Sequence, residues 1–198
     1  MKVGVLSLQG DVREHVSALI ACGINPVEVR RPSELAQVDA LVLPGGESTT
    51  IAQLSEIFGL YQPIKDRIAQ GMPVYGSCAG MILLADSILD SKQGQKTFGG
   101  LDITVRRNAF GRQVDSFESD IEFSDGSPHL IRAVFIRAPW VEKIGPNVEV
   151  LATVDNHPVA VRSASLLATS FHPELTHDHR IHRYFIEEVA RPALEKVK

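Results

Sequence analysis

The chain has 198 residues, of which 44% are hydrophobic and 22% are charged, the ordinary balance of a soluble globular protein. A formal net charge of −4 without a lysine- or arginine-rich run argues against nucleic-acid binding. The apolar stretches fall short of the roughly 20 residues that cross a bilayer, which argues against a membrane protein.

Strand and helix signals alternate through the first half of the chain. Short apolar runs that stop at glycine or proline predict strands, and apolar residues at helical spacing predict helices. Asp11 followed by Glu14 resembles a capping box at the start of the first helix. Such alternation predicts a parallel sheet covered on both faces. The strands are expected at 2–7, 27–29, 39–43 and 73–75, and the helices from 12 to Gly23, at 49–58, at 60–70 and at 81–85.

The second half is dominated by short strands with tight connections, and an amphipathic helix at 178–195 ends it. The pattern predicts an antiparallel extension, the last strands of the main sheet and a helix that packs back onto them. We therefore expect a single α/β domain over residues 1–198, a flavodoxin-like three-layer sandwich with a mostly parallel sheet and a small antiparallel extension. The predicted strands are 101–106, 117–123, 131–136, 148–154, 158–162 and 166–171.

The segment Gly76-Ser77-Cys78-Ala79-Gly80 lies where a predicted strand runs into a helix. A nucleophile on such a turn projects outward from the sheet, as in the G-x-S-x-G elbow of hydrolases. The helix directs its positive end and free N–H groups at the sulfur, which favours thiolate. The alternative is a buried structural cysteine, but the glycines two positions before and after Cys78 favour a nucleophile. Cys22 lacks such a frame and is assigned to core packing.

A base for this nucleophile is expected in Ser170-Phe171-His172-Pro173-Glu174. His172 follows an apolar strand and would also lie at a strand end. Glu174 can reach back to the imidazole, fix its tautomer and stabilise imidazolium. The alternative is a loop histidine that caps a neighbouring carbonyl beside a solvated Glu174. Together with the Cys78 turn, the pair predicts a Cys78–His172–Glu174 triad.

The loop Pro44-Gly45-Gly46-Glu47-Ser48-Thr49 follows another predicted strand end. Its glycines expose backbone N–H groups, and the N–H of Gly46 could pair with that of Ala79 as an oxyanion hole. A phosphate-binding loop or a plain tight turn are the alternatives. The pattern lacks the lysine of a Walker motif, which weakens the first of them.

These motifs together resemble the class I, triad-type glutamine amidotransferases. Within that class, several segments resemble the glutaminases of pyridoxal 5′-phosphate synthase, from the first strand to the last helix. Small departures are Ser77, where threonine is expected, and His177, where an acidic residue is expected; neither is a triad residue. The matching segments are 4–10, 13–15, 45–50, 107–118, 135–139 and 170–175.

The resemblance implies hydrolysis of L-glutamine to glutamate and ammonia. It also implies a partner, the barrel-shaped synthase subunit, in a large hetero-oligomer that receives the ammonia, and it implies no cofactor. Free ammonia is mostly protonated near neutral pH and is then a poor nucleophile, which favours delivery through a tunnel. The residues implied to bind glutamine are Gly46, Glu47, Ser48, Arg107, Ile136 and Arg137. An α-carboxylate suits N–H donors at a helix start and a nearby arginine, whereas surface salt bridges are the alternative for both arginines.

The remaining histidines carry weaker signals. His177, His179 and His182 have a spacing that could ligate a metal, but a polar helix start is the favoured interpretation and no metal site is expected. His15, His129 and His157 show nothing beyond surface or core positions.

Two other functions stay open from the sequence. A cysteine hydrolase or peptidase on a similar sheet would share the turn at Cys78, but the Gly45–Ser48 loop and the His-Pro-Glu spacing fit it less well. A non-catalytic binding subunit would be indicated by a missing triad residue, and all three are present. Without an export signal, reduced thiols and a cytoplasmic location are expected.

Overall fold

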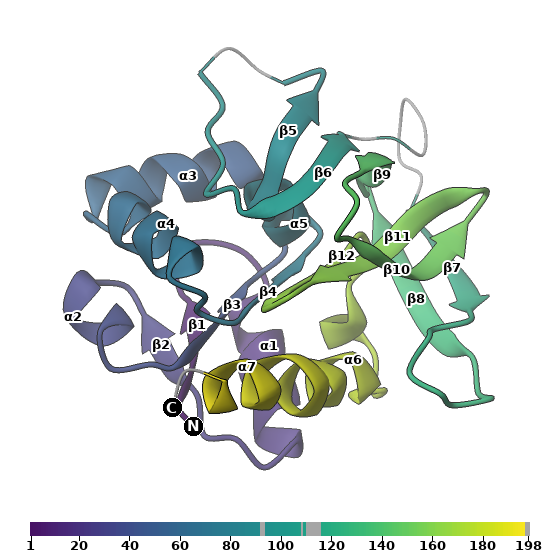
Figure 1. Cartoon of the computed structure of the whole chain (residues 1–198), viewed down its shortest axis with the longest axis horizontal. Helices are drawn as coiled ribbons and strands as arrows, with labels where there is room; N and C mark the ends of the chain where they lie inside the picture. Colours follow the sequence, from purple (N-terminus) through teal and green to yellow (C-terminus); the bar gives the residue numbers. More distant parts are fainter. Residues whose placement is uncertain (92–93, 108, 110–115, 197–198) are drawn as a thin grey trace.

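A seven-stranded, mostly parallel sheet forms the centre of the protein (Figure 1). The computed structural model describes residues 1–91, 94–107, 109 and 116–196. Adjacent parallel pairs run from β12 through β4, β3 and β1 to β2, whereas β11 and β10 are antiparallel at one edge. In the order of the sheet, the strands are β10 (Glu149–Val154), β11 (His157–Ser163), β12 (Leu166–Thr169), β4 (Val74–Ser77), β3 (Ala40–Leu43), β1 (Val3–Leu6) and β2 (Val27–Val29).

Helices cover both faces of this sheet, because its central strands are apolar on both sides. Leu41 and Leu43 of β3 belong to the core cluster under α3, α4 and α5, whereas Ala40 and Val42 belong to the cluster under α1 and the C-terminal helix. The result is a three-layer sandwich. The helical segments are α1 (Val12–Ala21), α2 (Pro32–Leu35), α3 (Ser48–Ile57), α4 (Tyr61–Ala69), α5 (Ala79–Leu84), the 3-10 turn η1 (Pro173–Leu175), α6 (Arg180–Tyr184), the π-helical η2 (Phe185–Ala190) and α7 (Arg191–Glu195).

Two smaller sheets extend the molecule beyond the sandwich. In one, β5 (Ala85–Leu89) pairs parallel with β6 (Leu101–Arg106), which pairs antiparallel with β9 (Trp140–Ile144). In the other, β7 (Ser116–Ile121) pairs antiparallel with β8 (Ile131–Ile136). Residues at the carboxyl end of β8 line a pocket at the edge of the main sheet.

The predicted α/β sandwich with an antiparallel extension is confirmed, and three local expectations are corrected. The Asp11 side chain does not cap α1, and its carboxylate contacts His172 instead. The last helix begins at Arg180 rather than at residue 178 and contains a π-helical segment. The strands β5 and β9 and the short helix α2 were not predicted. In the part of the chain that the structure describes, no helix has the length and apolar character needed to cross a membrane.

Candidate active site

Loops from four neighbouring strands converge at the carboxyl edge of the main sheet. They follow β1, β3, β4 and β12, which are adjacent in the order β12-β4-β3-β1. Ligands of open α/β sheets bind at this edge. Together with β8 and the ends of β5 and β6, these loops enclose a pocket of about 480 Å³. It is lined by Gln9, Asp11, Gly46, Glu47, Ser48, Cys78, Ile82, Asp90, Arg107, Ile136, Arg137 and His172.

Cys78 occupies the turn between β4 and α5 with a backbone conformation that is rare for a residue with a side chain. Its φ is 47° and its ψ is −99°, and the residue is 7% exposed. A Cβ on Gly76 would overlap the backbone of Gly80, and a Cβ on Gly80 would overlap the carbonyl oxygen of Leu43. The flanking glycines are therefore steric requirements of the turn that directs the sulfur into the pocket.

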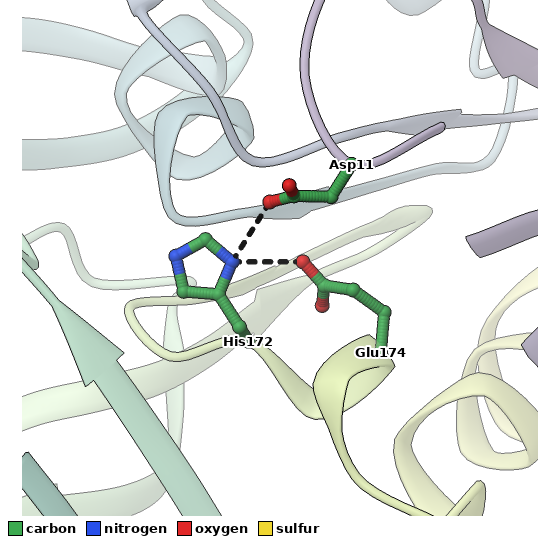
Figure 2. Close-up of side chains that lie close together, drawn as sticks. All are labelled: Asp11, His172 and Glu174. Atoms are coloured by element: carbon green, nitrogen blue, oxygen red, sulfur yellow. Dashed lines mark hydrogen bonds and ion pairs between the residues drawn. The ribbon is translucent and has the colours of Figure 1, made fainter. Parts of the chain in front are cut away.

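The imidazole of His172 contacts two carboxylates through a single nitrogen (Figure 2). Its Nδ1 lies 2.8 Å from Oε1 of Glu174 and 3.2 Å from Oδ2 of Asp11. Burial lowers the pKa of His172, but hydrogen bonds with Asp11, Cys78 and Glu174 outweigh it and raise the pKa well above its ordinary value. At neutral pH the site therefore holds an imidazolium beside the sulfur.

The Asp11, His172 and Glu174 ligand atoms lie within 4.8 Å of one another, a spacing that a metal ion could bridge. The Nδ1 atom that would bind the metal is already held by both carboxylates at hydrogen-bond distance. We therefore interpret the three residues as a hydrogen-bonded group centred on Nδ1 of His172. Asp11 was missed as a site residue because its proximity to residue 172 depends on how the sheet brings β1 and β12 to one edge.

A second group of polar side chains lies behind Glu174, away from the pocket. His15, Ser77 and His182 are all 0% exposed. Ser77 Oγ donates to Glu174 Oε1 at 3.3 Å and lies 2.9 Å from Nε2 of His15. Nδ1 of His15 lies 3.0 Å from Nε2 of His182. His182 lies near the start of the last helical segment, as expected, but it is fully buried in this polar group. His177 is exposed and His179 half-buried.

The loop after β3 is held in place by the loop after β1. The amide of Glu47 donates to Oε1 of Gln9 at 2.9 Å, and the amide of Asp11 donates to the carbonyl of Gly45 at 3.1 Å. Gly46 lines the pocket with a φ of 151°, which favours glycine, and Ala79 begins α5 directly after Cys78. Their assignment as oxyanion-hole donors stays a prediction.

The structure brings the six residues that the sequence assigned to glutamine binding into the pocket that Cys78 and His172 line. Arg107 donates to Oε1 of Glu47 at 3.1 Å. The side chain of Arg107 is only 11% exposed, so this pair is not an ordinary surface salt bridge. Glu47 also accepts from the amide of Thr50 at 2.7 Å, so it caps α3. Arg137, at the end of β8, is exposed and has a φ of 45°.

Part of the segment 107–118, on which the resemblance relied strongly, lies outside the described residues. Asn108 and residues 110–115 belong to that part. Cys22 packs at the edge of the core, as expected, and both cysteines are free. Burial raises the pKa of the Cys22 thiol.

Comparison with solved structures defines the class of protein to which this fold belongs. A crystal structure of a glutamine amidotransferase is 48% identical, with a TM-score of 0.87 over 93% of this chain and 97% of that one. A structure of PurLQS from Thermotoga maritima shares the fold at 17% identity, with a TM-score of 0.64 over 100% of this chain and 98% of that one. The fold is thus that of the glutamine amidotransferases.

The family can be stated more narrowly. Residues 5–191 match the SNO glutamine amidotransferase family, and the chain belongs to that family. Proteins named pyridoxal 5′-phosphate synthase subunit PdxT are similar over nearly their whole length. The Parafrankia sp. protein is 61% identical, covering 95% of this chain and 93% of its own, and the Acidothermus cellulolyticus protein is 60% identical, covering 97% and 95%.

Proposed function

We propose that this protein hydrolyses L-glutamine to L-glutamate and ammonia and supplies the ammonia to a pyridoxal 5′-phosphate synthase subunit. The observation that carries the proposal is the buried His172, whose Nδ1 lies 2.8 Å from Oε1 of Glu174, in a pocket at the sheet edge that Cys78 also lines. The similarity to the PdxT proteins supports the partner. The barrel shape of that partner and a large hetero-oligomer are part of the same proposal.

The reaction begins with the Cys78 thiolate, which the neighbouring imidazolium stabilises. The sulfur attacks the side-chain amide carbon of glutamine, and the oxyanion forms near the N–H groups of Gly46 and Ala79. His172 then protonates the amide nitrogen, ammonia leaves, and a glutamyl thioester remains on Cys78. A water molecule, deprotonated by His172, attacks the thioester and releases glutamate and the thiol.

Substrate orientation depends on the charged groups at the opposite end of the pocket. Arg107 and Arg137 line it together with the backbone of Gly46–Ser48 at the start of α3. The α-carboxylate of glutamine suits the arginines and the free N–H groups of the helix start, and the carboxylate of Glu47 suits the α-ammonium group. We place the protein in the cytoplasm, where the two free thiols stay reduced.

The test replaces each cysteine with alanine in a separate variant. Cys78→Ala is expected to reduce glutamate release below about 0.1% of wild type, because no other group replaces a missing covalent nucleophile. Cys22→Ala is the matched control and should retain wild-type activity, since Cys22 lies in the core away from the pocket. Glutamate is measured with and without the synthase partner, and the folded state is checked by circular dichroism.

Retention of more than a few per cent of wild-type rate by Cys78→Ala would exclude the sulfur as nucleophile. Wild-type protein that releases no glutamate, with or without the synthase, would contradict the proposed reaction as a whole.

A further inference from the structure

The carboxylate of Glu174 lies between two imidazoles. Its Oε1 atom is 2.8 Å from Nδ1 of His172 and 3.4 Å from Nε2 of His15. His15 comes from α1 and Glu174 from η1, two elements that contact each other. The reaction proposed above uses His172 and gives no role to His15, which is nonetheless fully buried.

Ser77 connects the two residues and immediately precedes the nucleophile. Its Oγ lies 2.9 Å from Nε2 of His15 and 3.3 Å from Oε1 of Glu174. The side chain comes from the last residue of β4, so the strand that presents Cys78 on one side contacts the triad carboxylate on the other. The rings of Tyr75 and His182 pack around His15, with centroids 6.0 and 5.2 Å away.

The direction of the two hydrogen bonds made by Ser77 can be assigned. An ionised carboxylate only accepts, so the Ser77 hydroxyl donates to Glu174 and must itself accept from Nε2–H of His15. Burial, with a smaller contribution from His15, lowers the pKa of His182 to about 3, so that ring is neutral. Nε2 of His182 lies 3.0 Å from Nδ1 of His15, and Nδ1 of His182 has no hydrogen-bond partner among the described residues.

The hydrogen bonds donated by His15 and Ser77 thus lead to Glu174. Burial raises the pKa of that carboxyl, but interactions with His15 and His172 outweigh it and lower the pKa well below the ordinary value. An uncompensated buried carboxylate would instead take up a proton and lose its hold on the imidazole.

We propose that His15, acting through Ser77, is a positioning residue that keeps Glu174 ionised and directed at His172. The expected effect of His15 on kcat rests on the proposed glutaminase function. The expected effect of His15 on the ionisation of Glu174 does not. The charged and titratable groups around His15 are Glu174, His182 and the hydroxyl of Tyr75, which is hydrogen-bonded to Thr169.

The experiment compares His15→Leu, which removes the donor, with His15→Gln, which keeps an N–H at a similar position. In the presence of the synthase, His15→Leu should lower kcat about ten-fold with little change in KM, the scale of one lost hydrogen bond to a charged group. The acidic limb of the pH profile should move to higher pH, because Glu174 then takes up a proton more readily. His15→Gln should restore most of kcat. Ser77→Ala, a smaller change, should shift the profile in the same direction.

Leu19→Ala is the matched control, since Leu19 is a fully buried residue on the same helix. It should lower stability while leaving the pH profile in place. The Glu174 carboxyl is also titrated by ¹³C NMR in all variants, a readout that needs no activity. An acidic limb and a Glu174 titration unchanged in both His15→Leu and Ser77→Ala would overturn the proposal, as would an equal shift in Leu19→Ala. Wild-type protein without glutaminase activity would refute the proposed function, whereas the NMR titration would still decide the role of His15.

Discussion

Asp11 places a second carboxylate on the imidazole that Glu174 already holds. The Asp11 side chain is 35% exposed, whereas that of Glu174 is fully buried. Solvent therefore screens the charge of Asp11 more strongly than that of Glu174. Glu174 is therefore the main orienting group, and Asp11 adds to the raised pKa of His172 from the pocket side.

Asp11→Asn should lower the pKa of His172 relative to wild type. The change removes a negative charge that favours imidazolium, so the ring loses its proton at a lower pH. The measurement is an NMR titration of the His172 ring in isotopically labelled protein. Glu118→Gln, which removes a surface carboxylate paired with Arg132, is the control and should have no effect. A His172 titration that is the same in Asp11→Asn and wild type would show that Asp11 does not act on the ring.

Residues with local signals could be predicted from the sequence, and residues placed by the fold could not. Cys78 has glycines on both sides, and His172 and Glu174 are two positions apart, so short patterns indicate them. Asp11 contacts His172, and His15 contacts Glu174, across more than 150 positions of the chain. Asp11 also matched a capping-box pattern, and this local interpretation competed with its actual contact.

At the scale of elements, the junction of β4 and α5 depends on close packing against β3. In helices an alanine is ordinarily favoured over a glycine by about 1 kcal/mol. At Gly80 the overlap of a new Cβ with the Leu43 carbonyl should reverse that preference. The packing therefore overrides the intrinsic helix propensity at this position.

Gly80→Ala should accordingly lower the free energy of unfolding by at least about 2 kcal/mol. Gly23→Ala is the control: its φ of 79° carries a backbone cost of about 1 kcal/mol, and a Cβ there would meet open space. Urea denaturation followed by circular dichroism measures both. A Gly80→Ala protein as stable as wild type would show that β3 and α5 can separate without cost.

Elements with strong apolar periodicity lie where the sequence predicted them. Strands whose conformation depends on pairing with a neighbouring strand were not predicted. The central strands and α1, α3 and α4 belong to the first group. β9 exposes most of its residues and β5 continues directly from α5, so neither shows the alternation of a half-buried strand. Their pairing with β6 decides their conformation, and that pairing has no signature in either segment alone.

At the scale of the whole molecule, the buried neutral His182 links folding to pH. Its pKa is about 3 in the folded protein, against an ordinary value of 6.5. Below pH 6.5 the unfolded chain therefore binds a proton that the folded protein does not, and stability must fall as the pH falls.

Between pH 7.5 and 5.0, His182 should account for about 2 kcal/mol of lost unfolding free energy. Replacing it with glutamine should reduce the pH dependence by that amount, whatever the change in stability at pH 7.5. Urea denaturation at both pH values provides the comparison. His129→Gln is the control, because His129 is exposed and should leave the pH dependence in place. An identical pH dependence in wild type and His182→Gln would contradict the assignment.

The two free thiols of the protein differ in their surroundings, and this difference allows molecules with a reactive pocket thiol to be counted. Cys78 lines the pocket beside an imidazolium, whereas Cys22 is partly buried, has a raised pKa and contacts the carbonyl of His179 at 3.8 Å. A brief exposure to an alkylating reagent in small excess should therefore modify Cys78 before Cys22, since the raised pKa of Cys22 disfavours the reactive thiolate. The mass of the intact chain after such a pulse gives the fraction of molecules whose pocket thiol is reactive, which allows turnover to be expressed per working site.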